Sequence, residues 1–144
     1  MATQNYANHR QLVPMFHGVL FGIIVLTLIG SVVNLIESFG DHQRLYSASL
    51  IVAVCIALVI LFLFTRIFSL KAQDRAIRAE ENLRHFAMTG KLLDPRLGTL
   101  QTVALRFASD GEFVALARRA AEEGLTPDAI KRAVKNWRPD TYRV

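Results

Sequence analysis

The stretch Gly18-Val-Leu-Phe-Gly-Ile-Ile-Val-Leu-Thr-Leu-Ile-Gly-Ser-Val-Val-Asn-Leu-Ile36 decides how this chain folds, because its 19 residues include no ionisable side chain. At 1.5 Å per residue, a helix over this stretch covers roughly 28 Å, which is close to the thickness of a bilayer's hydrocarbon core. A second apolar run, from about Ala48 to Leu70, is interrupted only by Arg66, whose long side chain can reach the membrane interface. The two runs predict membrane-spanning helices over about 17–36 and 46–66.

The composition of the whole chain agrees with a membrane protein. The chain has 144 residues, of which 52% are hydrophobic, and a mean hydropathy of +0.30, a value that soluble domains of this size seldom reach. Charged residues gather after the second apolar run, and the net charge is +5. This arrangement excludes a secreted disulfide scaffold, a large enzyme and a disordered chain. The single cysteine, Cys55, cannot form an intrachain disulfide.

The charges beside the apolar runs predict the orientation. The connector 37–44 is polar and nearly neutral, whereas the flank of the second run carries Arg66, Lys71 and Arg75. By the positive-inside rule this flank is cytoplasmic, so both termini are expected in the cytoplasm and the connector outside. The same three cations lie near enough to the bilayer to attract anionic lipid headgroups, although a plain solvated face is an alternative interpretation.

The predicted fold is therefore an all-α membrane protein in three parts. A cytoplasmic N-terminal segment covers 1–16, and an antiparallel transmembrane hairpin of two helices covers 17–70. A cytoplasmic helical domain covers 71–144, beginning with a stalk that continues the second spanning helix and followed by three short helices.

Small residues recur at every fourth position of both predicted spans. With a turn centred on Asp41–His42, an antiparallel hairpin brings small positions opposite larger ones and places Asn34 beside Ser49. Small residues allow close approach where lipid provides no hydrophobic drive, and Ser49 offers the Asn34 amide a partner. The Gly18-x-x-x-Gly22 spacing equally suits a homodimer, and the two arrangements can coexist. The predicted helix-packing residues are Gly18, Gly22, Gly30, Asn34, Ser49, Ala53 and Ala57.

The stalk, 71–89, has strong helix propensity and is followed by Gly90, a suitable C-terminal cap. Three short helical patterns follow, with a capping box at Ser109–Glu112, a second cap at Thr126–Pro127, and Pro139 as the expected end of the last helix. Their apolar faces are too small to form a secure core alone, so they are expected to fold back on the stalk or to dock on a partner. The stalk's apolar stripe consists of Ala72, Ala76, Ala79, Leu83 and Phe86.

Residues with metal-binding or catalytic spacing are missing from the sequence. The four histidines do not stand at helical spacing to one another, so no metal site and no catalytic residue are predicted. His17 and His9 are weak candidates for an axial cofactor ligand, against the simpler interpretation of interfacial histidines that contact water or headgroups. The carboxylate pair Asp110 and Glu112 is better explained by helix capping than by acid–base catalysis. Acidic residues interleave with the basic ones, so nucleic-acid binding is not expected.

Segments at both ends of the chain resemble a family of small bacterial two-span proteins of unknown function. The resemblance rests on Asn5-Tyr-Ala-Asn-His9, Phe86-x-x-Thr-Gly-Lys91, Leu105-Arg-Phe-Ala-Ser-Asp110, Lys135-Asn-Trp-Arg-Pro-Asp140 and the ending Tyr142-Arg-Val144. It implies a protein of the bacterial inner membrane with a cytoplasmic helical tail, and it brings no activity or cofactor. It also suggests that the Asn5–His9 stretch and the Trp137–Pro139 corner are contact surfaces.

The function expected from these features is a non-enzymatic interaction protein of the inner membrane, either an accessory subunit of a larger complex or a small homo-oligomer. Its partners would be membrane lipids and other subunits or a second copy, with Trp137, Phe107 and Phe113 as candidate partner contacts. Two alternatives stay open: an oligomeric ion pore, and a cofactor-binding accessory subunit for electron transfer.

Overall fold

The computed structural model describes residues 4–9 and 12–140, and in that part the chain is helical, with no strand beyond an isolated bridge between Ala108 and Trp137. The Tyr142–Val144 ending lies outside the described residues. The chain divides into two compact units: a two-helix unit, Leu12–Ser69, and a helical domain made of Met1–Gln11 and Leu70–Val144. The helices are η1 (Met15–Leu20), α1 (Phe21–Glu37), α2 (His42–Thr89), α3 (Thr99–Leu105), α4 (Asp110–Glu123) and α5 (Pro127–Ala133).

Two helical stretches, Met15–Glu37 and His42–Thr89, are long and apolar enough to cross a membrane. The first begins and ends within two residues of the predicted span 17–36. The second begins four residues before the predicted start at 46, because the Asp41 carboxylate accepts hydrogen bonds from the backbone N–H groups of Gln43 and Arg44, both at 3.1 Å. It then continues without a break for 48 residues, so the second apolar run and the predicted stalk form one helix.

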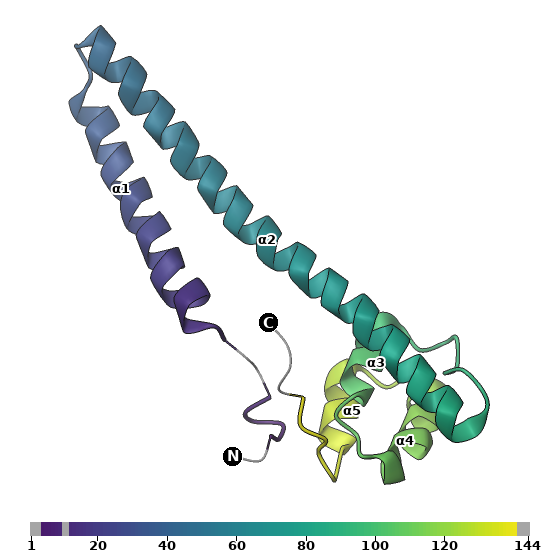
Figure 1. The fold of residues 1–144 in the computed structure, drawn as a ribbon. Helices are drawn as coiled ribbons and strands as arrows, with labels where there is room; N and C mark the ends of the chain where they lie inside the picture. Colours follow the sequence, from purple (N-terminus) through teal and green to yellow (C-terminus); the bar gives the residue numbers. More distant parts are fainter. Residues whose placement is uncertain (1–3, 10–11, 141–144) are drawn as a thin grey trace. The chain divides into compact units, whose positions relative to one another are not determined.

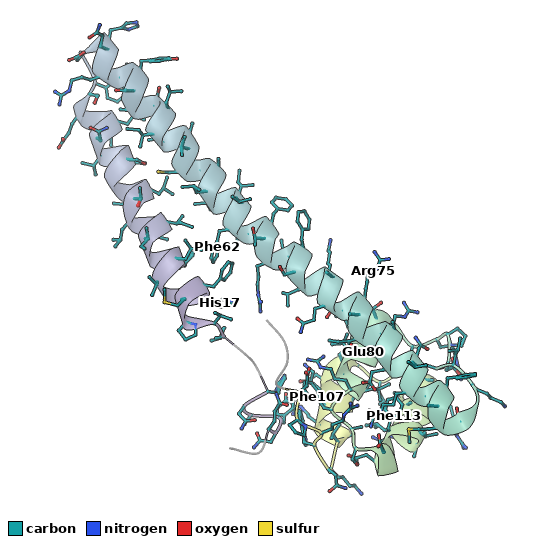
Figure 2. All side chains as sticks on the ribbon, in the orientation of Figure 1. His17, Phe62, Arg75, Glu80, Phe107 and Phe113 are labelled. Atoms are coloured by element: carbon teal, nitrogen blue, oxygen red, sulfur yellow. The ribbon has the colours of Figure 1, made fainter. Side chains whose placement is uncertain are left out.

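In the two-helix unit, α1 and the first part of α2 lie side by side, joined by residues 38–41 (Figure 1). The Phe62 ring of α2, labelled in Figure 2, stacks on Phe16: the ring centroids are 4.4 Å apart and the planes are inclined by 15°. The buried residues of the two helices recur at about every seventh position, the spacing of a coiled-coil seam. They are Ile24, Ser31 and Ser38 on one side and Ala48 and Cys55 on the other.

This seam differs from the predicted helix-packing face. Gly18, Gly30, Asn34, Ser49, Ala53 and Ala57 are exposed, Gly22 is half-buried, and a Cβ built on any of the three glycines would meet no atom within 4 Å. The turn lies between Phe39 and Gly40, where Gly40 has a φ of +101°, so the register differs from that of a turn centred on Asp41–His42.

The predicted Asn34–Ser49 contact is also not formed. The Ser49 hydroxyl donates instead to the Tyr46 carbonyl oxygen at 2.7 Å, within its own helix. The Asn34 side-chain amide has no hydrogen-bond partner in the part of the chain that the structure describes. In a single copy, the predicted small-residue face is therefore left uncovered.

In the helical domain, α3, α4 and α5 gather beside the last part of α2 (Figure 1). The largest fully buried side chains there are Leu105, Phe107, Phe113 and Ile130, together with Thr102. Two of the predicted helix boundaries are confirmed. The Thr126 hydroxyl accepts a hydrogen bond from the Ala129 N–H at 3.2 Å, with Pro127 next to the cap. Gly90 ends α2 with a φ of +73°, and its N–H bonds to the Phe86 carbonyl oxygen at 2.7 Å.

Two predictions about this domain were wrong. α5 ends at Ala133, not at Pro139, because the following residues run extended beside Ala108: the Ser109 N–H bonds to the Asn136 carbonyl oxygen at 3.1 Å. The Glu112 side chain does not return to the Ser109 amide. Its carboxylate accepts hydrogen bonds from the backbone N–H groups of Lys135 and Asn136, at 3.1 and 2.9 Å.

The three short helices do fold back on α2, but they do not cover its apolar stripe. The residues of α2 that become buried in the helical domain are Ile77 and Glu81, whereas all five members of the stripe are exposed. A polar face can be buried here because its charges are paired, as described next.

Candidate functional site

The N-terminal segment folds into a turn and contacts the helical domain. The Asn5 side-chain oxygen accepts a hydrogen bond from the Ala7 N–H at 2.9 Å, which is an Asx turn. The turn presents Tyr6, whose hydroxyl donates to Asp128 Oδ1 at 2.6 Å. The Arg132 guanidinium lies 5.0 Å from the centre of the Tyr6 ring and bonds to the other Asp128 oxygen at 2.9 Å.

These contacts set the charge state of Asp128. The hydrogen bond from the Tyr6 hydroxyl lowers the pKa of the Asp128 carboxyl below its ordinary value of 3.8, and Arg132 adds to the effect. The ionised form of Asp128 therefore favours the docked segment. Since Tyr6 and Asp128 are 122 residues apart, no local sequence pattern could reveal their contact.

His9 packs on the helical domain as an aromatic ring. Its centroid lies 5.8 Å from that of Phe107 and 6.0 Å from that of Trp137. Its Nδ1 is 2.6 Å from the Tyr6 carbonyl oxygen and its Nε2 is 3.2 Å from Lys131 Nζ. Both ring nitrogens therefore have protein neighbours, and a cofactor ligated by His9 would have to displace one of them.

His17, the other candidate cofactor ligand, lies in η1, where its Nδ1 accepts a hydrogen bond from the Val13 N–H at 3.1 Å. Among the described residues, no group of three or more His, Cys, Asp and Glu side chains could hold a metal ion. His9 and His17 therefore each lie outside any such group.

The candidate partner contacts are largely interior. Phe107 and Phe113 are fully buried in the domain core, so they cannot contact a partner while the domain is folded. Trp137 is half-buried, and its ring centroid lies 4.8 Å from that of Phe107. The two segments suspected as contact surfaces, Asn5–His9 and the Trp137–Pro139 corner, contact each other through His9.

A buried ion network attaches α2 to the start of α4. The Arg84 guanidinium bonds to Glu81 at 2.9 Å, to Asp110 at 2.6 Å and to the Ala108 carbonyl oxygen at 2.8 Å. Its central carbon lies 4.2 Å from the centre of the Phe113 ring. The hydrogen bond from Arg84 lowers the pKa of Asp110. Each of the three guanidinium nitrogens of Arg84 thus donates to an acceptor, and these hydrogen bonds hold α2 against the start of α4.

A small open cavity of about 190 Å³ lies next to this network, between α2 and the C-terminal corner. Its lining includes Arg106, which bonds to Asp140 at 2.7 Å and lies 4.3 Å from the centre of the Phe107 ring. Arg138, also in the lining, is 3.7 Å from Glu81. Arg106 and Arg138 are thus each paired with a carboxylate of the domain, and Glu80, which also lines the cavity, forms no ion pair with a described residue.

Two charged side chains at the edges of the apolar stripe of α2, Arg75 and the cavity-lining Glu80, are arranged differently. Arg75 and Glu80 are exposed, and neither forms an ion pair or hydrogen bond with a described residue. They flank the uncovered apolar stripe on opposite sides. Sequence reasoning identified the stripe and Arg75 but did not single out Glu80.

The fold and these surfaces define a class: an all-helical protein with two helices apolar enough to cross a membrane and a small helical domain closed by its own N-terminal segment. The chain belongs to a family of unknown function, DUF6526, whose model matches residues 1–144. The resemblance to an uncharacterised family is therefore confirmed. No curated protein and no solved structure matches the chain.

Proposed function

We propose that this protein is a non-enzymatic interaction protein of the bacterial inner membrane. In this proposal Leu12–Ser69 crosses the bilayer twice as an antiparallel hairpin, and the helical domain lies in the cytoplasm. The protein serves as an accessory subunit of a membrane complex or as a small homo-oligomer.

One observation carries the topology of this proposal. The N-terminal segment packs on the helical domain through Tyr6–Asp128 and His9–Trp137, so the chain both enters and leaves the two-helix unit from the same domain. Such a chain must cross a membrane an even number of times. Two apolar helices joined by the short polar loop 38–41 satisfy this requirement.

The flanking charges support the orientation of the hairpin. Arg66, Lys71 and Arg75 follow the apolar part of α2, and Lys71 and Arg75 are exposed. Cations in this position favour the cytoplasmic side and attract anionic headgroups, at about 1 kcal/mol per charge near the membrane surface.

The uncovered surface of the hairpin supports an interaction role. Gly18, Gly30, Ala53 and Ala57 leave open space on the outward faces, where another helix could approach closely. The Asn34 amide has no partner among the described residues, and in hydrocarbon it would gain from a hydrogen bond to a neighbouring helix. In the described part of the helical domain, by contrast, the buried charges Glu81 and Arg106 and the largely buried Arg84 are paired within the fold.

Native mass spectrometry after mild detergent extraction tests this function. The proposal predicts a dimer, a higher oligomer or a complex with another membrane protein. Asn34→Leu should reduce that species, whereas Val33→Leu, next to it on the helix, should not. A strictly monomeric protein that co-purifies with no other protein would contradict the proposal.

A further inference from the structure

The uncovered stripe on α2 has the spacing of a coiled-coil seam. Its members Ala72, Ala76, Ala79, Leu83 and Phe86 are separated by four, three, four and three residues, which is the a/d pattern of a heptad repeat. Leu83 is 67% exposed and Phe86 is 51% exposed, although this part of α2 already contacts a folded domain. Side chains so placed favour a partner helix.

The helical domain leaves this stripe accessible because it occupies the other side of α2. Ile77 and Glu81, which it buries, fall at the b and f positions of the same heptad repeat, on the outer surface of a coiled coil. A second helix could therefore pack on the stripe without displacing α3, α4 or α5. At Ala76 and Glu80 it would lie next to the open cavity that these two residues share with the C-terminal corner.

The charges beside the stripe specify both the partner and its direction. Arg75 falls at a g position and Glu80 at the following e position, so in a parallel pair of identical helices Arg75 of each copy faces Glu80 of the other. In an antiparallel pair, g faces g and e faces e, so Arg75 of one copy could not face Glu80 of the other. Both side chains are exposed and unpaired among the described residues, and Figure 2 shows Arg75 extending away from α3–α5.

We propose that the stripe binds the same stripe of a second copy of this chain, forming a parallel two-stranded coiled coil over 72–86 with two reciprocal Arg75–Glu80 ion pairs. The three alanines allow close approach, and Leu83 and Phe86 provide most of the apolar area that becomes buried. The helix is already formed as part of α2, so pairing does not have to nucleate it. This inference deepens the proposed function and rests on it, since copies inserted in the same direction in one membrane can meet only in parallel.

Disulfide crosslinking in native membranes tests the register. In a Cys55→Ala background, Leu83→Cys should give a crosslinked dimer on mild oxidation, because equivalent a positions face each other in a parallel pair. Met88→Cys is the matched control: it is also an exposed apolar residue at this end of α2, but it falls at an outward f position. It should crosslink at least about tenfold less efficiently, because cysteines at outward positions are too far apart to form a disulfide.

Charge exchange tests the recognition without a cysteine at the seam. Arg75→Glu alone and Glu80→Arg alone should each weaken dimerisation on the order of tenfold, because two attractive pairs become repulsive. The variant carrying both changes should dimerise like the wild type. Mixing the two single variants should give the mixed dimer in preference to either homodimer. Lys71→Glu makes the same charge change near the same membrane surface at an outward position, and it should not affect the dimer.

The outcomes separate this inference from the proposed function. The inference is wrong if neither the crosslink nor the charge rescue occurs. The proposed function still stands in that case if Leu83→Cys is labelled from the cytoplasmic side and native mass spectrometry finds a complex with another protein. A crosslink from Met88→Cys as strong as that from Leu83→Cys would also overturn it. Labelling of Leu83→Cys from outside the cell would overturn the topology itself.

Discussion

Replacing Arg84 by alanine should strongly destabilise the helical domain. The Arg84 side chain is only 12% exposed, and it neutralises Glu81, whose side chain is 6% exposed. Removing the guanidinium leaves Glu81 as a buried carboxylate with Arg138 as its remaining cation, 3.7 Å away. Leaving one member of a buried ion pair uncompensated costs about 3–5 kcal/mol, so we expect a loss of about 3 kcal/mol in the free energy of unfolding.

The chain offers a specific reporter for this measurement. Trp137 is its only tryptophan and packs on Phe107 in the domain core, so tryptophan fluorescence follows the helical domain alone. With a urea dependence of about 1 kcal/mol per molar for a domain of this size, the unfolding midpoint of the full chain in detergent should fall by about 3 M.

Two controls show whether buried charge is the cause. Arg118→Ala removes an arginine that pairs with Glu122 but is 80% exposed, and it should change the free energy of unfolding by less than about 0.5 kcal/mol. Changing Arg84 to Met and Glu81 to Gln together should cost clearly less than Arg84→Ala alone, because no buried charge is left uncompensated. If Arg84→Ala matched the wild type, or if the double variant were as unstable as the single one, the reasoning would be refuted.

Three further perturbations address the other contacts. Because the pKa of Asp128 is lowered, its ionised form stabilises the docked N-terminal segment above pH 3.8, and this stabilisation is lost as the pH falls through the folded-state pKa. Tyr6→Phe should remove most of this pH dependence, which NMR signals of residues 5–9 would report. Phe107→Ala should destabilise the helical domain by about 3–5 kcal/mol, measured by urea unfolding, since the ring is fully buried. Ala48→Leu should overpack the seam of the two-helix unit by about 1–3 kcal/mol, whereas Ala53→Leu on the exposed side should not, measured by unfolding in detergent.

The parts of the fold predictable from sequence were those set by local patterns. The two apolar runs gave both long helices, and turn residues such as Gly90 and Thr126 gave correct boundaries, because capping depends on residues close together in the chain. Which face of each long helix packs against the other depends on the register of the hairpin, and this was not predicted correctly. Gly40 tightens the turn, so the register shifts and Ser31 and Ala48 are buried in place of the predicted small residues.

The contacts of the helical domain could not be read from local sequence. Apolar spacing alone favoured the Ala72–Phe86 stripe as the covered face of α2, whereas the domain packs on the side of Glu81, since Arg84 and the start of α4 compensate its charge. Phe107 and Phe113 looked available for a partner only because the core seemed too small to enclose them. The docked N-terminal segment completes that core from the other end of the chain.

The central claim is that the chain crosses the membrane twice and keeps both ends in the cytoplasm, and accessibility labelling of single cysteines in intact cells tests it most directly. With Cys55 replaced by alanine, a cysteine at Gln43, in the first turn of α2, should react with a membrane-impermeant maleimide added outside. Cysteines at Ala7 and Leu92 should react only after the membrane is permeabilised. Labelling of Ala7 and Leu92 on opposite sides, or of Leu92 from outside, would contradict the account.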